Sequence, residues 1–310
     1  MDPTPMVVRP FTRAEAAGLG LTPARLRLAV RDGAVRRVLR GVYMRGDVPL
    51  TMEIRVAAAA RVMNADAVVC DRTAAWIWGV DTFAFRELDG VPALETFVLR
   101  GRPRTSRAEC RGGVRDLMPA DWVEVGGVKI TTPLRTALDL GCRLDRREAL
   151  AAMDALMRAH GFSRADLARA LLRYRRRRGV IQLRELVPLV DPRAESPRES
   201  WTRLEMLDFG LPSPELQWWV EVNGVPTYRL DLAYPHARIG VEYDGVENHS
   251  RPEDRARDES RRAWLGAHGW TMVVIGADEL GPEGDRGWLV AIQEALRAAQ
   301  RPPRRSYARR

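Results

Sequence analysis

The chain has 310 residues, of which 45% are hydrophobic and 29% are charged, so it is long enough for two domains with packed cores. No stretch approaches the roughly 18 apolar residues of a membrane helix, and residues 1–13 lack a secretory signal pattern. Three widely spaced cysteines exclude a disulfide scaffold and a cysteine-based zinc site. These features exclude an integral membrane protein and predict a cytoplasmic location.

The net charge of +9 points to an anionic partner such as nucleic acid. The basic residues are almost all arginines, because Lys129 is the only lysine. Arginine bias alone does not establish binding, since genome composition also produces it. Any mechanism that needs a catalytic lysine must therefore use Lys129.

Residues 1–50 are predicted to form a winged helix-turn-helix. Thr12 and Glu15 have the spacing of a capping box that opens a short helix. Thr22-Pro23 then begins a second helix, which runs to Arg31. Residues 35–44 alternate between apolar residues and arginine, as a strand or wing does.

The segment contains the residue series Phe11, Arg13, Gly20, Leu26, Gly33, Val35 and Arg40-Gly41-Val42-Tyr43. With this series it resembles the winged helix that opens AbiEi-type antitoxin proteins, a domain that binds DNA in that family. A small dimerisation or docking module is the alternative. Arg36, Arg37 and Arg40 are candidate phosphate contacts, although arginines on a wing also simply face solvent.

Residues 51–190 are predicted to be a mixed, largely helical connecting region without an active-site constellation. Strands are expected at 96–100 and 122–131, the latter with a hairpin turn at Gly126-Gly127. The expected helices cover 52–63, 132–142, 146–160 and 163–175, and residues 71–79 are a segment whose Trp76 and Trp78 are expected in the core.

Four arginines, Arg175 to Arg178, are expected to close the last of these helices. They are either a solvated helix end that complements the macrodipole or a patch that contacts phosphate. Residues 191–197 have the composition of a linker. The proline- and arginine-rich residues 301–310 are expected to be a disordered basic tail.

Residues 195–300 are predicted to form an αβββαβα unit. A helix follows Ser196, and Asn223-Gly224 is a strong hairpin signal between the first two strands. A polar helix, an apolar strand and a final helix complete the order. The expected strands are 216–222, 227–234, 238–244 and 270–275, and the later helices are 253–268 and 287–297.

Acidic residues occur in these strands at positions where an ordinary strand does not place them. Glu242 and Asp244 are two residues apart and project to the same face, and Asp231 lies beside them if its strand pairs antiparallel with theirs. Crowded carboxylates repel one another unless they bind protons or a cation, and Mg²⁺ prefers such oxygen ligands. Glu199 and His249 are further candidates for this site.

The following helix carries arginines that could hold a phosphodiester backbone while a bound metal activates water for its hydrolysis. Part of this set is alternatively structural, because Asp254 and Asp258 lie at helical spacing from Arg261 and Arg262. The candidate DNA contacts here are Arg255, Arg261 and Arg262, together with Arg257.

Residues 195–300 resemble an endonuclease-like domain of uncharacterised actinobacterial proteins, related to very-short-patch-repair endonucleases and the PD-(D/E)XK superfamily. The motif series comprises Glu199, Gly210-Leu211-Pro212, Gln217, Arg229-x-Asp231, Glu242-Tyr243-Asp244-Gly245, His249, Asp258-x-x-Arg261 and Gly269-Trp270. A Thr131-Thr132-Pro133-x-Arg135-Thr136-x-x-Asp139 stretch extends the resemblance toward the N-terminus.

The resemblance implies that Asp231, Glu242 and Asp244 bind the metal, that His249 matches a downstream histidine, and that Glu199 matches the helix acid. The usual lysine is absent, because Asp244 occupies its position. Either His249 or Arg255 replaces it, or the domain no longer cuts. In another alternative, Asp231 and Glu242 are partners of buried arginines such as Arg229.

The sequence therefore predicts an α+β protein with a winged helix, a mixed α/β middle region and a restriction-endonuclease-like core. The leading prediction is a Mg²⁺- or Mn²⁺-dependent endonuclease that acts on double-stranded DNA. The alternative is a non-catalytic DNA-binding regulator or antitoxin with a degenerate nuclease fold. A protein-interaction module that neutralises a toxin and a homodimeric assembly also stay open.

Overall fold

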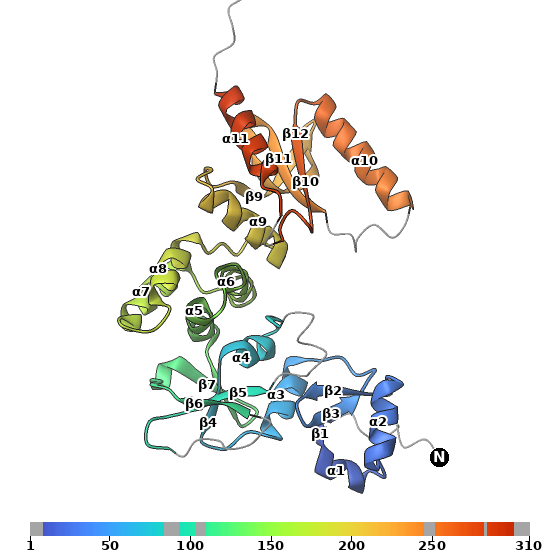
Figure 1. Ribbon diagram of the computed structural model, residues 1–310, viewed down its shortest axis with the longest axis vertical. Coiled ribbons are helices and arrows are strands. Elements are labelled where there is room, and N and C mark those ends of the chain that lie inside the picture. Colours follow the sequence, from blue (N-terminus) through green and yellow to red (C-terminus); the bar gives the residue numbers. More distant parts are fainter. Residues whose placement is uncertain (1–8, 84–92, 103–109, 245–251, 282–283, 301–310) are drawn as a thin grey trace, which may run out of the picture. The chain divides into compact units, whose positions relative to one another are not determined.

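The computed structural model describes residues 9–83, 93–102, 110–244, 252–281 and 284–300, and the side chains of 252–256 are outside this description. The chain divides into two compact units, Met1–Val190 and Asp191–Arg310 (Figure 1). In the described parts of the chain, no helix combines the length and the apolar character needed to cross a membrane.

The first unit begins with the predicted helix-turn-helix and wing. Thr12 and Glu15 form the expected capping box, and the side chain of Thr22 caps the second helix. The wing is a hairpin of two strands rather than one strand, because Gly41 adopts a positive φ and turns the chain. The elements are β1 (Phe11–Thr12), α1 (Arg13–Gly18), α2 (Pro23–Arg31), β2 (Val35–Leu39) and β3 (Val42–Arg45), with sheet order β1-β3-β2.

The rest of the first unit contains a five-stranded mixed sheet of order β6-β5-β4-β8-β7, next to helix α4 (Figure 1). Strand β4 pairs in parallel with β8 and antiparallel with β5, so residues 61 positions apart become neighbours, as in the pair Val69 and Ile130. The elements are α3 (Met52–Ala60), β4 (Ala67–Val69), α4 (Asp71–Ile77), β5 (Leu94–Val98), β6 (Cys110–Val114), β7 (Trp122–Val125) and β8 (Val128–Thr131).

Four helices complete this unit, and their order corrects one prediction. The expected helix 163–175 stops at Leu171 and continues only as a 3-10 turn, Leu172–Tyr174. Arg175–Arg178 therefore form a connection before another helix, and do not close one. The helices are α5 (Pro133–Arg143), α6 (Arg146–His160), α7 (Arg164–Leu171) and α8 (Val180–Leu186).

The second unit has the predicted element order. Its four-stranded sheet runs β12-β11-β10-β9, and the Asn223-Gly224 turn has positive φ at both residues, as a two-residue hairpin requires. Helices α9 and α11 supply buried side chains such as Met206 and Ile292 to its core. The elements are α9 (Pro197–Asp208), β9 (Glu215–Val222), β10 (Val225–Tyr234), β11 (Ile239–Asp244), α10 (Pro252–Ala267), β12 (Thr271–Gly276) and α11 (Gly287–Ala299).

Candidate functional site

The winged segment exposes arginines on its second helix and on its wing. Arg25 and Arg27 project from α2, while Arg37 and Arg40 lie on the wing, and all four are exposed. Arg36 differs, because it is half-buried and donates a hydrogen bond to the carbonyl oxygen of Val48. Two of the three predicted wing contacts are therefore available to a ligand, and the third holds the wing to the chain that follows it.

Three predicted carboxylates come together in the second unit, from α9, β10 and β11. The antiparallel pairing of β10 with β11 joins Leu232 to Val241, so Asp231 and Glu242 follow at adjacent positions. Burial, and then the charges of Glu199 and Glu242, raise the pKa of Asp231 to about 7. Asp231 is thus close enough to both glutamates for their charges to act on its carboxyl group.

Guanidinium groups and amides hold the other acidic residues. Both oxygens of Glu242 accept hydrogen bonds from Arg261, at 2.8 and 2.7 Å, and Arg262 lies 2.9 Å from Asp244. Glu199 accepts from the Gln217 side chain at 2.7 Å. Two of the arginines predicted to contact DNA are therefore partners of the carboxylates.

This arrangement does not fit Mg²⁺ or Mn²⁺ as the side chains lie. Both oxygens of Glu242 are engaged by one guanidinium, whereas a metal needs them as free ligands. Within the described ranges, no group of three or more His, Cys, Asp or Glu side chains is placed to hold a metal ion. His249 and the Arg255 side chain lie outside the described residues. The alternative partner Arg229 instead pairs with Glu195, at 2.9 Å.

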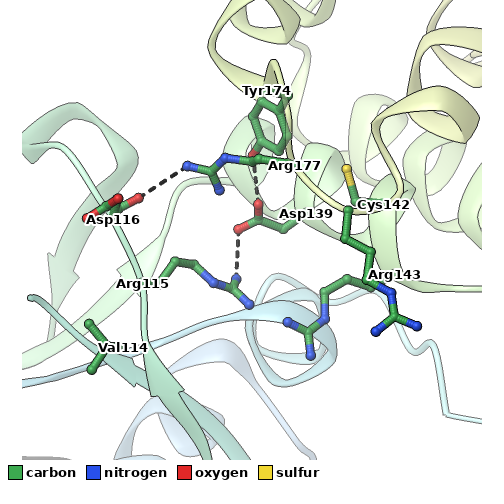
Figure 2. A pocket seen from close by; sticks show the side chains of 9 residues that line it. Val114, Arg115, Asp116, Asp139, Cys142, Arg143, Tyr174 and Arg177 are labelled. Atoms are coloured by element: carbon green, nitrogen blue, oxygen red, sulfur yellow. Dashed lines mark hydrogen bonds and ion pairs between the residues drawn. The ribbon is translucent and has the colours of Figure 1, made fainter.

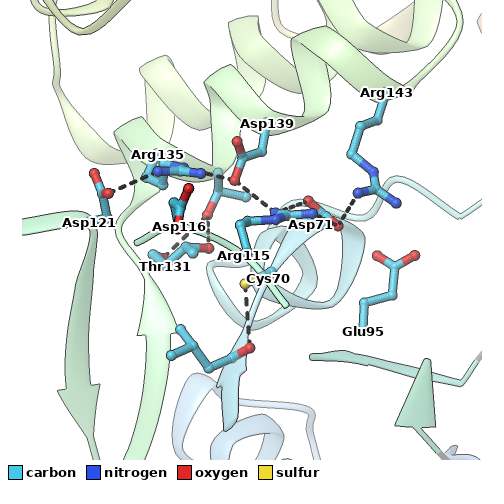
Figure 3. Close-up of polar contacts among 12 residues, drawn as sticks. Cys70, Asp71, Glu95, Arg115, Asp116, Asp121, Thr131, Arg135, Asp139 and Arg143 are labelled. Atoms are coloured by element: carbon cyan, nitrogen blue, oxygen red, sulfur yellow. Dashed lines mark hydrogen bonds and ion pairs between the residues drawn. The ribbon is translucent and has the colours of Figure 1, made fainter. Parts of the chain in front are cut away.

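A buried polar network in the first unit was missed by sequence reasoning (Figure 3). Asp139 of α5 accepts from Arg115 at 2.9 Å, from Arg135 at 2.8 Å and from the Tyr174 hydroxyl at 2.7 Å. Arg115 also donates twice to Asp71, at 2.8 Å each. The network thus joins the residue after β6 to α4, α5 and the 3-10 turn after α7.

The network continues to Asp121, which accepts from Arg135 at 2.8 Å and from both terminal nitrogens of Arg173. Burial alone raises the pKa of Asp121, but the hydrogen bonds of Arg173 and of the Met118 amide outweigh it and lower that pKa. Asp71 adopts a φ of 54° within this network. Burying charged groups and holding an aspartate at positive φ both cost folding free energy. We therefore interpret this region as a structured domain and not as a simple connection between the two ends of the chain.

The sequence carried one signal for this network. Arg135 and Asp139 are four residues apart in a helix whose neighbouring residues, Ala137, Leu138 and Leu140, are apolar and buried. Charged residues at helical spacing on a buried face need partners from elsewhere in the fold. Those partners cannot be identified from the sequence, since Asp71 and Arg115 lie on other elements.

Two parts of the first unit match models of AbiEi-type antitoxin domains. Residues 6–46 match the family "Transcriptional regulator, AbiEi antitoxin", and residues 67–189 match the "AbiEi antitoxin C-terminal domain". The predicted resemblance of the winged segment to AbiEi antitoxins is therefore confirmed, and most of the region predicted as a connector also matches an AbiEi domain model.

Two proteins of Mycobacterium tuberculosis are similar over most of the chain. "Uncharacterized protein MT2308" of strain CDC 1551 and "Uncharacterized protein Rv2248" of strain H37Rv are each 36% identical over 266 residues. The match covers 86% of this chain and 94% of each relative. The chain belongs to the same family as these mycobacterial proteins.

Proposed function

We propose that the protein is a DNA-binding regulator of the AbiEi antitoxin class, whose winged segment binds double-stranded DNA. The observation that carries this proposal is the exposed arginine surface formed by α2 and the wing. Helix α2 is the second helix of the helix-turn-helix, and its first turns carry Arg25 and Arg27. In such motifs the second helix enters the major groove with its N-terminal residues toward the base edges.

The wing supplies the contacts that do not depend on sequence. Arg37 and Arg40 are exposed and, within the part of the chain that the structure describes, neither has a carboxylate within 4.0 Å. Guanidinium groups of this kind bind backbone phosphates and release counterions. The hydrogen bond from Arg36 to Val48 joins the wing to the chain that follows β3.

The test measures binding of the full-length protein to DNA from upstream of its own gene by fluorescence anisotropy. Arg25→Ala is expected to weaken specific binding by about 1–3 kcal/mol, and Arg37→Ala to reduce the salt slope by about 1. Arg184→Ala, at an exposed arginine of α8, is the matched control and should leave binding unchanged. Equal losses in all three variants would show that only overall charge matters.

An antitoxin also has a protein partner, and the AbiEi class supports a cognate toxin for this chain. Co-purification with the product of the adjacent gene, when that gene encodes a protein toxic on its own, tests this part separately. Rescue of growth by the full-length protein supports the antitoxin role. Continued toxicity despite a stable, DNA-binding protein leaves only the regulator.

Metal-dependent cleavage of DNA is the second candidate function. It is favoured by one observation, the convergence of Glu199, Asp231 and Glu242 from three elements. It is opposed by the Arg261–Glu242 ion pair. Plasmid incubated with Mn²⁺ should be nicked by the wild type and left intact by Asp231→Ala if the unit cuts. An intact plasmid under every metal condition, with DNA binding retained, would leave the regulator as the function.

A further inference from the structure

A pocket of about 630 Å³ opens beside the buried network in the first unit (Figure 2). Its volume lies in the range of small-molecule binding sites. It is lined by the end of β6, the C-terminal turn of α5, and the connection before α8. The lining residues are Val114, Arg115, Asp116, Asp139, Cys142, Arg143, Tyr174, Arg177 and Arg178; we call it the arginine pocket.

Positive charge exceeds negative charge around this pocket. Arg115 is only 9% exposed and forms ion pairs with Asp71 and Asp139, so its charge is already balanced and its side chain lines the base of the pocket. Asp116 is paired with Arg100, at 3.2 Å. The remaining lining arginines, Arg143, Arg177 and Arg178, supply the excess charge.

These three arginines keep donors for a ligand. Arg143 is 49% exposed and approaches Asp71 with one nitrogen, at 3.3 Å. Among the described residues, Arg177 and Arg178 have no carboxylate within 4.0 Å, and Arg177 reaches only the backbone oxygen of Asp116, at 3.5 Å. Figure 2 shows Arg115 and Arg143 on one side of Asp139 and Tyr174 on the other.

One side-chain contact and one close backbone approach position the connection that carries Arg177 and Arg178. Arg177 packs over the Tyr174 ring with its guanidinium carbon 4.7 Å from the ring centroid. Gly179 adopts a φ of 79°, and a Cβ at that position would lie 2.0 Å from the carbonyl oxygen of Cys142. Only glycine permits this approach, so the connection carrying Arg177 and Arg178 is pressed against the end of α5. A preorganised set of guanidiniums binds an anion at lower entropic cost than flexible ones do.

The chemistry of the pocket indicates binding rather than catalysis. Burial raises the pKa of the Cys142 thiol to about 11, so it is protonated and a poor nucleophile at neutral pH. Guanidinium groups recognise phosphate through paired donors. Three of them match a doubly charged phosphate group better than a single carboxylate, and the volume exceeds that of a phosphate alone.

We propose that the arginine pocket binds a phosphorylated small molecule of nucleotide size, with its phosphate held by Arg143, Arg177 and Arg178. This site is separate from the winged segment and does not depend on the proposed DNA binding.

Isothermal titration calorimetry of the full-length protein tests the proposal with orthophosphate, pyrophosphate, AMP, ADP and ATP as probes, at two salt concentrations. We expect saturable 1:1 binding that the double variant Arg143→Gln/Arg177→Gln weakens at least about tenfold. Arg164→Gln/Arg184→Gln removes the same charge from exposed positions on α7 and α8 and should bind as the wild type does. Tighter binding of nucleotides than of pyrophosphate identifies a nucleoside phosphate as the source.

Three results would overturn the proposal. One is the absence of saturable binding to any probe, and another is equal weakening in both double variants. The third is a loss of duplex DNA affinity in Arg143→Gln/Arg177→Gln with no small-molecule binding in the wild type, which would make the pocket part of a DNA surface. Wild-type-like unfolding of the variants, measured by circular dichroism, excludes loss of the fold as the cause.

Discussion

Replacing Asp139 by asparagine is predicted to destabilise the first unit severely. The substitution keeps the volume of the side chain but removes its charge, and it places an amide NH₂ group against donors. Arg115, Arg135 and Tyr174 each lose their bond to a carboxylate that is only 4% exposed. Removing one member of a buried charged network typically costs about 3–5 kcal/mol. Domains are stable by only about 5–15 kcal/mol, so the loss is a large share.

Hydrogen–deuterium exchange of the full-length protein measures this loss in the unit where it occurs. A cost of about 3–5 kcal/mol accelerates exchange in the most protected amides of α5 by about 100-fold to several thousand-fold. Amides of α11 in the second unit provide an internal reference. Asp116→Asn is the matched control, because Asp116 is 66% exposed in its pair with Arg100 and should give no measurable change.

The reasoning would be refuted by α5 exchange in Asp139→Asn within fivefold of the wild type. It would equally fail if Asp116→Asn accelerated α5 as much. The first result would mean that the buried network adds little to stability, and the second that the loss of stability does not depend on burial of the carboxylate.

Other predictions concern the second unit and the glycine behind the arginine pocket. The folded chain keeps the Asp231 proton up to a pH of about 7, whereas the unfolded chain loses it near pH 3.8. The free energy of unfolding of the second unit should therefore fall as pH rises between these two values. Urea unfolding should show Asp231→Asn more stable than the wild type at pH 8, by up to about 4 kcal/mol, with little difference at pH 4. Arg261→Gln removes a charge that lowers this pKa, so a carboxyl-carbon NMR titration should place the Asp231 midpoint higher than in the wild type. Gly179→Ala should lower Tm by about 4–8 °C, because the new Cβ clashes with the backbone and the residue is also strained at positive φ. Gly161→Ala has a φ of 69° but open space around it, so it should lower Tm by less than half as much.

Local sequence signals predicted the first two helix starts and the hairpin turn of the second unit, because the interactions behind them are local. Thr12 with Glu15 and Asn223 with Gly224 act within four residues and form as expected. The short strands β4 and β6 were missed. The two glycines of β6, Gly112 and Gly113, are typical of a loop, and this strand exists because β5 pairs with it in parallel. Pairing partners at long sequence separation supply what local propensity does not.

In the candidate sites, too, the features set by local sequence were predicted and those set by long-range packing were not. The position of Asp231 beside Glu242 followed from strand alternation and a hairpin, both local features. The partner of Glu242 did not, because the sequence offers Arg229 and Arg261 alike and only the packing of α10 selects Arg261. The excess of arginine around the pocket is likewise invisible in the sequence, where Arg115, Arg143 and Arg177 lie more than 25 residues apart.

The ratio of guanidinium to carboxylate groups decides which ligand each unit favours. In the first unit Asp71 and Asp139 are already neutralised by arginines, so added positive charge from Arg143, Arg177 and Arg178 remains for an anion. In the second unit Arg261 pairs with Glu242, while burial and then the charges of Glu199 and Glu242 raise the pKa of Asp231 to about 7. A proton on Asp231 and a guanidinium on Glu242 together remove the two charges that would attract a divalent cation. Cleavage therefore requires Arg261 to leave Glu242 and Asp231 to ionise, whereas binding by the arginines of the first unit requires neither step.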